Sequence, residues 1–169
     1  MRRIRAREFF EQYKTLFDRR RAADPARLLA RFCDRRSWTD FMLNDTPLAF
    51  LPEVVEAVGN GCLEYRREFK LADLCAWEKV DDPYHKPQYN QPLYIHIVIE
   101  HEIAPTPEEE FWKLLHWYSP LMVHVCYSSR PAEWLKYFEQ VRAKVSTYHP
   151  RSTDEEYLVI IGPHRDTVF

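Results

Sequence analysis

Glycine is scarce in this chain: only three of its 169 residues are glycine. They form no glycine-rich phosphate loop, which argues against an enzyme that acts on nucleoside triphosphates. Two of them, Gly59 and Gly61, flank Asn60 after an apolar run that begins near Pro52. This cluster predicts a firm turn that closes a helix.

Long apolar runs and paired cysteines are also missing. No run reaches the about 18 residues that a membrane-spanning helix needs, and the arginine-rich amino terminus lacks the apolar segment and cleavage site of a signal peptide. The cysteines form no Cys-x-x-Cys pair, and three lie in apolar runs, which is typical of reduced core residues. We therefore expect a cytoplasmic protein without a membrane partner. The cysteines are Cys33, Cys62, Cys75 and Cys126.

What the chain does contain favours one folded domain. Hydrophobic residues make up 46% and charged residues 30%, which suits a packed core under a polar surface. A domain of this length buries about two-thirds of the surface of its unfolded chain. Within it we distinguish a basic helical extension, residues 1–36, packed on an α/β core, residues 37–169.

Charge is unevenly spread although the net charge is only −2. Residues 1–36 contain eleven arginines and one lysine against five acids. Such asymmetry favours a polyanionic partner, and the alternative is a solvated basic helix face. The candidate phosphate-binding residues are Arg19, Arg20, Arg21, Arg35 and Arg36.

The apolar pattern changes from helical to strand-like spacing along the chain. Two amphipathic helices open it, and a third begins at Ser37 as a candidate cap. The later succession of strand, strand, helix, strand, helix, strand predicts an α/β fold with helices on a mixed sheet. A proline-rich polar stretch at 81–92 is typical of an exposed loop. The expected helices are 4–17, 24–33, 37–43, 52–58, 105–118 and 131–145, and the expected strands are 62–68, 71–78, 93–102, 121–127 and 157–161.

The strand-like run at 94–102 ends in two acids. Because side chains alternate along a strand, Glu100 and Glu102 share one face and His101 points to the other. The strand upstream contains a single acid, Asp73, among apolar neighbours. If the two strands pair, three carboxylates converge. Oxygen ligands of this kind suit Mg²⁺ or Mn²⁺ and often serve phosphoryl chemistry.

The order helix, hairpin with Asp73, strand ending in Glu-x-Glu, helix and strand resembles the PD-(D/E)xK nuclease superfamily. The resemblance spans residues 37–127 and implies a restriction-endonuclease-like core that hydrolyses phosphodiester bonds in DNA. It also implies that Asp73 and Glu100 bind Mg²⁺ or Mn²⁺. The lysine of the family motif falls on Glu102, so this chain departs from the motif there.

The resemblance suggests how that departure is accommodated. Some restriction endonucleases have an acid in the lysine's place, so Glu102 would bind metal or orient water. The family can supply its lysine from the following helix, where Lys113 is the candidate cation that offsets transition-state charge. The family's first helix often adds an acid, which is Asp40 here, with Glu53 and Glu56 as alternatives, and Glu68 is a further candidate.

Three alternatives stay open. The missing lysine favours a catalytically inactive relative that binds nucleic acid or protein. The amino-terminal helices could instead form the interface of a homo-oligomer. Asp73 and Glu100 could also be structural strand-end carboxylates bonded to backbone amides or to an arginine. The histidines at 96, 101, 116 and 124 fit no standard zinc spacing, and a hydrogen-bonded core role suits those within strands better.

Overall fold

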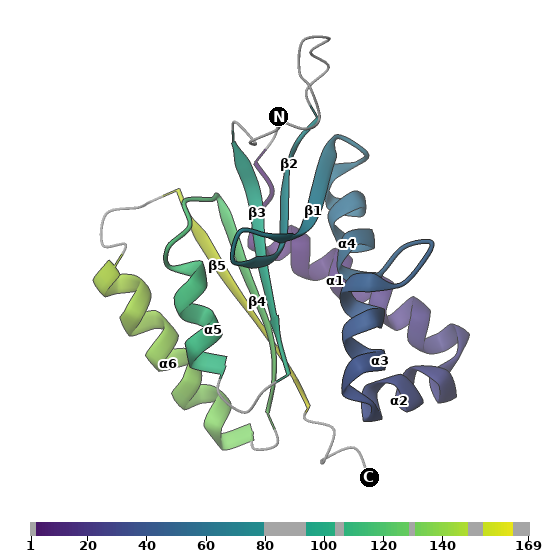
Figure 1. Cartoon of the computed structure of the whole chain (residues 1–169). Helices are drawn as coiled ribbons and strands as arrows, with labels where there is room; N and C mark the ends of the chain where they lie inside the picture. The colour runs from purple at the N-terminus through teal and green to yellow at the C-terminus, as the bar shows by residue number, and fades with distance from the viewer. Residues whose placement is uncertain (1–2, 80–93, 104–106, 129–130, 149–153, 164–169) are drawn as a thin grey trace.

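The computed structural model describes residues 3–79, 94–103, 107–128, 131–148 and 154–163. These residues form an α/β fold in which helices flank a five-stranded mixed sheet (Figure 1), as the sequence predicts. The proline-rich stretch at 81–92 lies outside the described residues. In the described part of the chain, no helix combines the length and apolar character needed to cross a membrane.

Helices make up the amino-terminal part of the chain, and aspartates start two of them. The Asp24 carboxylate accepts a hydrogen bond from the Arg27 backbone N–H at 2.9 Å. The Asp34 carboxylate accepts one from Ser37 N–H at 2.7 Å, so Asp34, not Ser37, caps the third helix. The elements are α1 (Ala6–Ala23), α2 (Pro25–Cys33), α3 (Arg35–Thr39), the π-helical turn η1 (Asp40–Asn44) and α4 (Phe50–Gly59).

The turn after α4 is built as the glycine cluster predicts. Asn60 adopts a left-handed conformation with φ 47°, and Gly61 follows with φ 74°. At Gly59 a Cβ atom would lie 2.7 Å from Leu63 Cγ, so only glycine lets the strand leave the helix this closely. The end of α4 therefore depends on this short segment.

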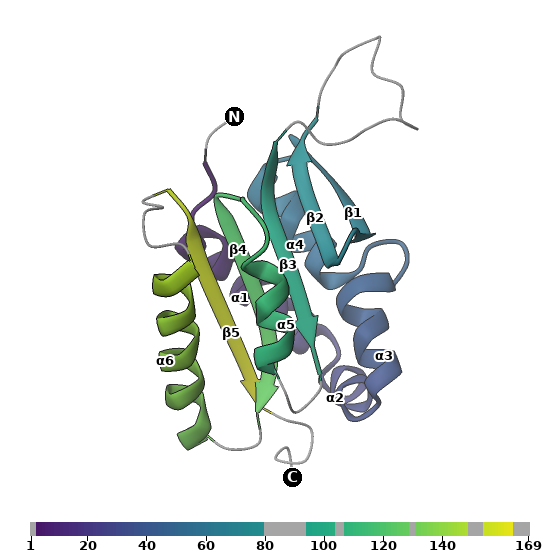
Figure 2. The same cartoon turned by 60° about the vertical axis from the view of Figure 1, so that its left-hand side comes forward.

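The sheet has the strand order β1-β2-β3-β4-β5. The first three strands form an antiparallel meander, and β3, β4 and β5 run parallel. Parallel neighbours need crossover connections, which α5 and α6 supply (Figure 2). The elements are β1 (Leu63–Phe69), β2 (Ala72–Glu78), β3 (Ile95–Glu102), α5 (Pro107–Leu114), β4 (Leu121–Ser128), α6 (Pro131–Tyr148) and β5 (Glu156–Pro163).

The sheet lies between two helical layers. Helices α1 to α4 cover one face, and α5 and α6 cover the other (Figure 1). Alternate residues of β3 therefore enter different cores: Ile97 and Ile99 pack under α1 to α4, and Val98 packs under α5 and α6. Because both faces are buried, the central strands read as continuous apolar runs.

A buried polar contact links the amino-terminal helices to the sheet. Trp38 Nε1 of α3 donates a hydrogen bond to the Tyr127 hydroxyl of β4 at 2.7 Å. His101 Nε2 of β3 lies 3.1 Å from the same hydroxyl oxygen. Burial first, and the nearby His124 second, lower the pKa of His101 to about 3, so its ring is neutral. One hydroxyl group thus satisfies polar groups from a helix and a neighbouring strand.

Glu156 at the start of β5 fixes the beginning of α1. Its carboxylate accepts hydrogen bonds from Arg5 Nη1 at 2.6 Å and from Ala6 N–H at 2.7 Å. Partial burial raises the pKa of Glu156, but these donors together with Arg3 outweigh burial and hold that pKa below its usual value. The basic extension is therefore joined to the sheet by a carboxylate from the other end of the chain.

The cysteines are all free, but only two belong to the core. Cys75 and Cys126 are buried, whereas Cys33 and Cys62 are exposed. The expectation of core positions is therefore wrong for Cys33 and Cys62. Each sits at an element boundary, where the apolar pattern of the neighbouring element no longer requires burial.

We expect Tyr127→Phe to lower the free energy of unfolding by about 1–3 kcal/mol, because it leaves the Trp38 N–H and the His101 ring buried without this partner. Chemical denaturation measures the change. Tyr94→Phe is the matched control, since Tyr94 is 57% exposed. Equal stability of the Tyr127 variant and wild type would contradict a structural role for this hydroxyl.

Glu156→Gln should lower the free energy of unfolding by about 0.5–1 kcal/mol at neutral pH, where the charged carboxylate holds Arg5 and the start of α1. The pKa of Glu156 is lowered by folding. Its contribution is therefore complete above the unfolded pKa of about 4.3 and disappears as the pH falls through the folded value. Urea unfolding of both proteins at neutral and acidic pH tests this. A difference that persists or grows in acid would refute it.

Candidate active site

Asp73 and Glu100 lie next to each other on one face of the sheet. Leu74 pairs with Ile99 in the antiparallel ladder, and Asp73 and Glu100 are the next residues on the two strands. The Asp73 carboxylate also accepts a hydrogen bond from the His101 backbone N–H at 2.7 Å. The Asp73 carboxylate is thus bonded to the backbone of the residue that follows Glu100.

Both acids belong to the face covered by α5 and α6. Asp73 lies two residues before Cys75, and Glu100 lies two residues after Val98, so each acid shares a strand face with that residue. Cys75 and Val98 both pack in the core under those helices. Glu100 is only 1% exposed, whereas Asp73 is half-buried. Burial, and then the Glu100 carboxylate, raise the pKa of Cys75 to about 12. The Cys75 thiol is therefore protonated and is not a candidate nucleophile.

Glu102 lies at the carboxyl end of β3 rather than deep in the sheet. It is paired in register with Cys126 of β4, whose pKa is raised to about 12 by burial and then by the Glu102 charge. Its Oε1 atom lies 4.0 Å from Arg35 Nη2 of the opposite helical layer. Glu102 thus lies at the end of β3, within reach of a side chain from the other helical layer.

Lys113, the candidate displaced cation, is in the last turn of α5 on the same layer as Glu100. It lines a cavity of about 530 Å³ together with Lys70, Leu71, Trp112 and His116, among others. Lys70 and Leu71 form the turn that leads directly into the strand of Asp73. The structure therefore places Lys113 beside the beginning of β2.

The two additional acids occupy different settings. Glu68 lies between Arg67 and Phe69, which pair with Leu74 and Ala72, but the register does not include Glu68 itself. It is exposed and has φ 49°. Asp40 belongs to η1 in the other layer, where its carboxylate accepts a hydrogen bond from Asn44 Nδ2 at 3.2 Å. Glu68 is thus an exposed residue on the strand next to that of Asp73, and Asp40 belongs to the opposite layer.

His124 completes this row of titratable side chains. In the parallel pairing of β3 with β4 it stands beside Glu100. Its Nδ1 lies 2.6 Å from the Tyr137 hydroxyl of α6, and burial lowers its pKa to about 3. The sequence indicates a core histidine here, which is correct. It does not reveal the neighbour, because the register of two parallel strands joined by a helix has no local signal.

The sequence predicts that Asp73, Glu100 and Glu102 come together around Mg²⁺ or Mn²⁺. Within the described ranges, no three His, Cys, Asp or Glu side chains come together in a way that could hold a metal ion. Two carboxylates from adjacent strands are nevertheless compatible with Mg²⁺, which is often held by one or two carboxylates, waters and substrate phosphates. The expectation that Asp73, Glu100 and Glu102 converge as three ligands is therefore wrong.

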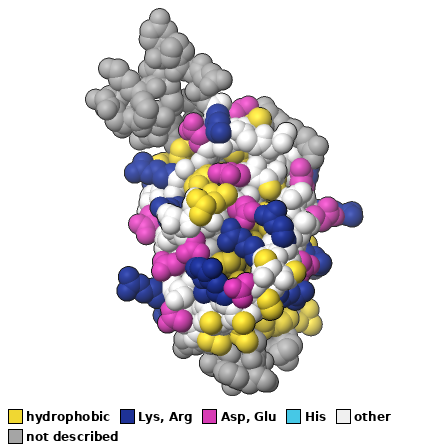
Figure 3. Space-filling view, turned by 90° about the vertical axis from the view of Figure 1, so that its right-hand side faces the viewer, with side chains coloured by type: hydrophobic (Ala, Val, Ile, Leu, Met, Phe, Trp, Pro, Cys, Tyr) yellow, Lys and Arg dark blue, Asp and Glu magenta, His cyan; other side chains and the backbone are white. Residues whose placement is uncertain are grey.

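The candidate phosphate-binding arginines are mostly engaged within the protein. Arg19 and Arg20 both contact Glu53, with Arg20 Nη2 2.6 Å from Oε2. Arg21 lies 3.0 Å from Asp18, and Arg35 faces Glu102. Arg36 on α3 is exposed. Figure 3 accordingly shows Lys and Arg side chains intermixed with Asp and Glu over the α1 to α4 layer.

These arginines and the Asp73–Glu100 pair lie on opposite sides of the sheet. Arg35 also belongs to the amino-terminal layer, but its side chain approaches Glu102 at the end of β3. A nucleic acid that contacted both the arginines and the acid pair would therefore have to run past the carboxyl end of β3. The sequence could not show this separation, since it gives no indication of which face each helix covers.

Comparison of the chain with protein-family models, with curated proteins and with solved structures gave no significant match.

We expect Arg20→Ala to lower the free energy of unfolding by about 1–3 kcal/mol, since it removes the Glu53 ion pair and a hydrogen bond to Leu48 O at 3.0 Å. Arg36→Ala should stay within about 0.5 kcal/mol of wild type, because Arg36 is exposed. Thermal melts of both variants measure the difference. Equal stability of the two variants would show that the Arg20–Glu53 pair is not structural.

Proposed function

We propose that the protein is a metal-dependent nuclease that hydrolyses phosphodiester bonds in DNA. The observation that supports this most directly is the adjacency of Asp73 and Glu100 on neighbouring strands. The order of elements around the pair, a helix, an antiparallel meander, α5 and a parallel β4, also agrees with the PD-(D/E)xK resemblance. Lys113 on α5 belongs to the same layer as the pair.

In the proposed mechanism, the Asp73 and Glu100 carboxylates would hold Mg²⁺ or Mn²⁺. Such an ion lowers the pKa of its bound water and neutralises charge on the phosphate. Glu102, at the open end of β3, would orient the attacking water. Lys113 would offset negative charge that develops on the phosphate in the transition state.

DNA would be held through sequence-independent phosphate contacts, which weaken as salt rises. Arg35 is the best placed of the candidate arginines, because it lies near Glu102. Arg36 is exposed one residue further along α3. Arg19, Arg20 and Arg21 would have to exchange their carboxylate contacts for phosphates. We place this activity in the cytoplasm, in keeping with four free cysteines.

The second candidate is a catalytically inactive protein of the same fold that binds nucleic acid or protein. Two observations favour it. Glu102 stands where the family motif has lysine, and Glu100 is almost fully buried, which is typical of a structural carboxylate. Asp73 would then serve to satisfy the His101 backbone N–H.

We expect Glu100→Gln and Asp73→Asn each to reduce Mg²⁺- or Mn²⁺-dependent cleavage of DNA by at least about 100-fold, more than the loss of an outer-shell partner causes. Each change removes a ligand charge with little change in shape. Cleavage of plasmid and single-stranded DNA measures activity, and calorimetric titration with Mn²⁺ measures metal binding. Glu64→Gln, an exposed acid on β1, is the matched control and should behave as wild type.

Thermal melts of the same proteins separate the two candidates. If the acids are only structural, both variants melt at a lower temperature and bind Mn²⁺ as wild type does. Wild-type cleavage that survives in both variants would refute the assigned site. No cleavage by wild type with either metal, together with salt-sensitive binding of labelled DNA, would favour the inactive binding protein.

A further inference from the structure

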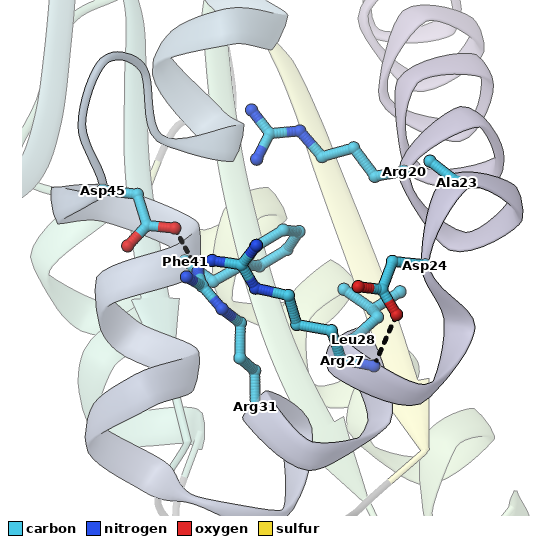
Figure 4. A pocket seen from close by; sticks show the side chains of 8 residues that line it. All are labelled: Arg20, Ala23, Asp24, Arg27, Leu28, Arg31, Phe41 and Asp45. Carbon is cyan, nitrogen blue, oxygen red and sulfur yellow. Dashed lines mark hydrogen bonds and ion pairs between the residues drawn. The ribbon is translucent and has the colours of Figure 1, made fainter.

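A small pocket in the amino-terminal layer gathers three arginines. It lies between the end of α1, the length of α2 and η1, and its volume is about 240 Å³. Arg20 of α1 and Arg27 and Arg31 of α2 extend into the same space around Phe41 (Figure 4). The guanidinium carbons of Arg20 and Arg31 lie 5.2 Å and 5.8 Å from the centre of the Phe41 ring.

Local structure dictates this convergence. Asp24 and Pro25 end α1 and start α2 with a sharp change of direction, so the last turn of α1 faces the side of α2. Arg27 and Arg31 are four residues apart and therefore project from the same side of the helix. Like charges at this spacing repel each other, and the ion pair of Arg31 with Asp45 offsets part of that repulsion.

Only part of this positive charge is compensated. Arg20 binds Glu53 through Nε and Nη2, at 2.9 and 2.6 Å, which leaves its Nη1 group outside those contacts. Arg31 contacts Asp45 through Nη1 alone. Among the described residues, the Arg27 side chain makes no hydrogen bond or ion pair, while its backbone N–H binds the Asp24 cap. N–H donors of three guanidinium groups thus remain available at one pocket.

Charge and size together indicate the ligand. Three arginines and two aspartates line the pocket. Glu53 pairs with Arg20 and Asp45 with Arg31, so among the described residues the guanidinium without an acidic partner is that of Arg27. The volume equals about eight water molecules and is below the about 300 Å³ at which pockets begin to hold drug-sized ligands. The fork of each guanidinium matches two oxygens of a phosphate group. A single tetrahedral oxyanion fits these conditions better than a whole nucleotide.

We propose that this pocket, formed by Arg20, Arg27 and Arg31 around Phe41, binds one phosphate group. The site is separate from the Asp73–Glu100 pair, because it belongs to the layer on the opposite face of the sheet. It does not depend on the nuclease proposal. The phosphate can come from a small phosphate compound or from the backbone of a nucleic acid, and both sources present the same group to the arginines.

The test is a titration of the full chain with inorganic phosphate at low salt, followed by calorimetry and by NMR of the arginine side chains. Wild type should show saturable binding at one site. Arg27→Gln should weaken the affinity at least about tenfold, because charge-assisted hydrogen bonds are lost. Arg142→Gln is the matched control, since it removes the same charge from an exposed position on α6 and should leave the affinity unchanged.

Two results would overturn the proposal: a wild-type signal that rises without saturating, or an equal loss of affinity in the Arg27 and Arg142 variants. Arg27 is exposed and is not part of the core, so its variant should fold, and a thermal melt checks this. A short single-stranded DNA then distinguishes the sources. Competition with phosphate that disappears in Arg27→Gln indicates the nucleic-acid backbone, and phosphate binding without such competition indicates a small phosphate compound.

Discussion

The burial of β3 on both faces is the constraint on which the rest of this structure depends. Helices cover the strand from both sides, so each of its residues is committed to one of two cores. A shift of one residue would exchange the two sets and bring Glu100 under the amino-terminal helices. The apolar neighbours of Glu100 therefore fix where its charge lies.

The burial of β3 on both faces also explains why the side chains of Glu100 and His101 have different neighbours. Glu100 enters the layer of α5 and α6, where it stands between Asp73 and His124. His101 enters the other layer, where the Tyr127 hydroxyl satisfies it together with Trp38. The two adjacent side chains thus have different surroundings, because they project from opposite faces of the sheet. The candidate chemistry lies on one side and the junction with the basic helices on the other.

The basic extension is less available for DNA than its composition indicates. Several of its arginines hold the fold together, since Glu53 binds two of them and Glu156 binds Arg5. Such contacts lower the net charge that the layer presents, which agrees with the mixed charges in Figure 3. Arg27 makes no side-chain ion pair among the described residues, and it lines the pocket that also contains Arg20 and Arg31.

The sequence by itself determined the elements and their order. The period of the apolar residues located the helices and strands, although α1 continues to Ala23, six residues beyond its expected end, and the cluster around Asn60 located the end of α4. It also put Glu100 and Glu102 on one face of their strand, because alternation is a local property. The alternation of β3 needs no information from distant parts of the chain.

Only the tertiary structure decided which side chains meet. The register between β2 and β3 brought the Asp73 carboxylate to the His101 backbone N–H, next to Glu100, and the register between β3 and β4 set His124 beside Glu100. The tertiary structure also shows that Asp34 caps α3 and that Cys33 and Cys62 are exposed. It places the arginines on the sheet face opposite the acids. Register and layer follow from the packing of segments far apart in the chain, and local sequence patterns do not encode that packing.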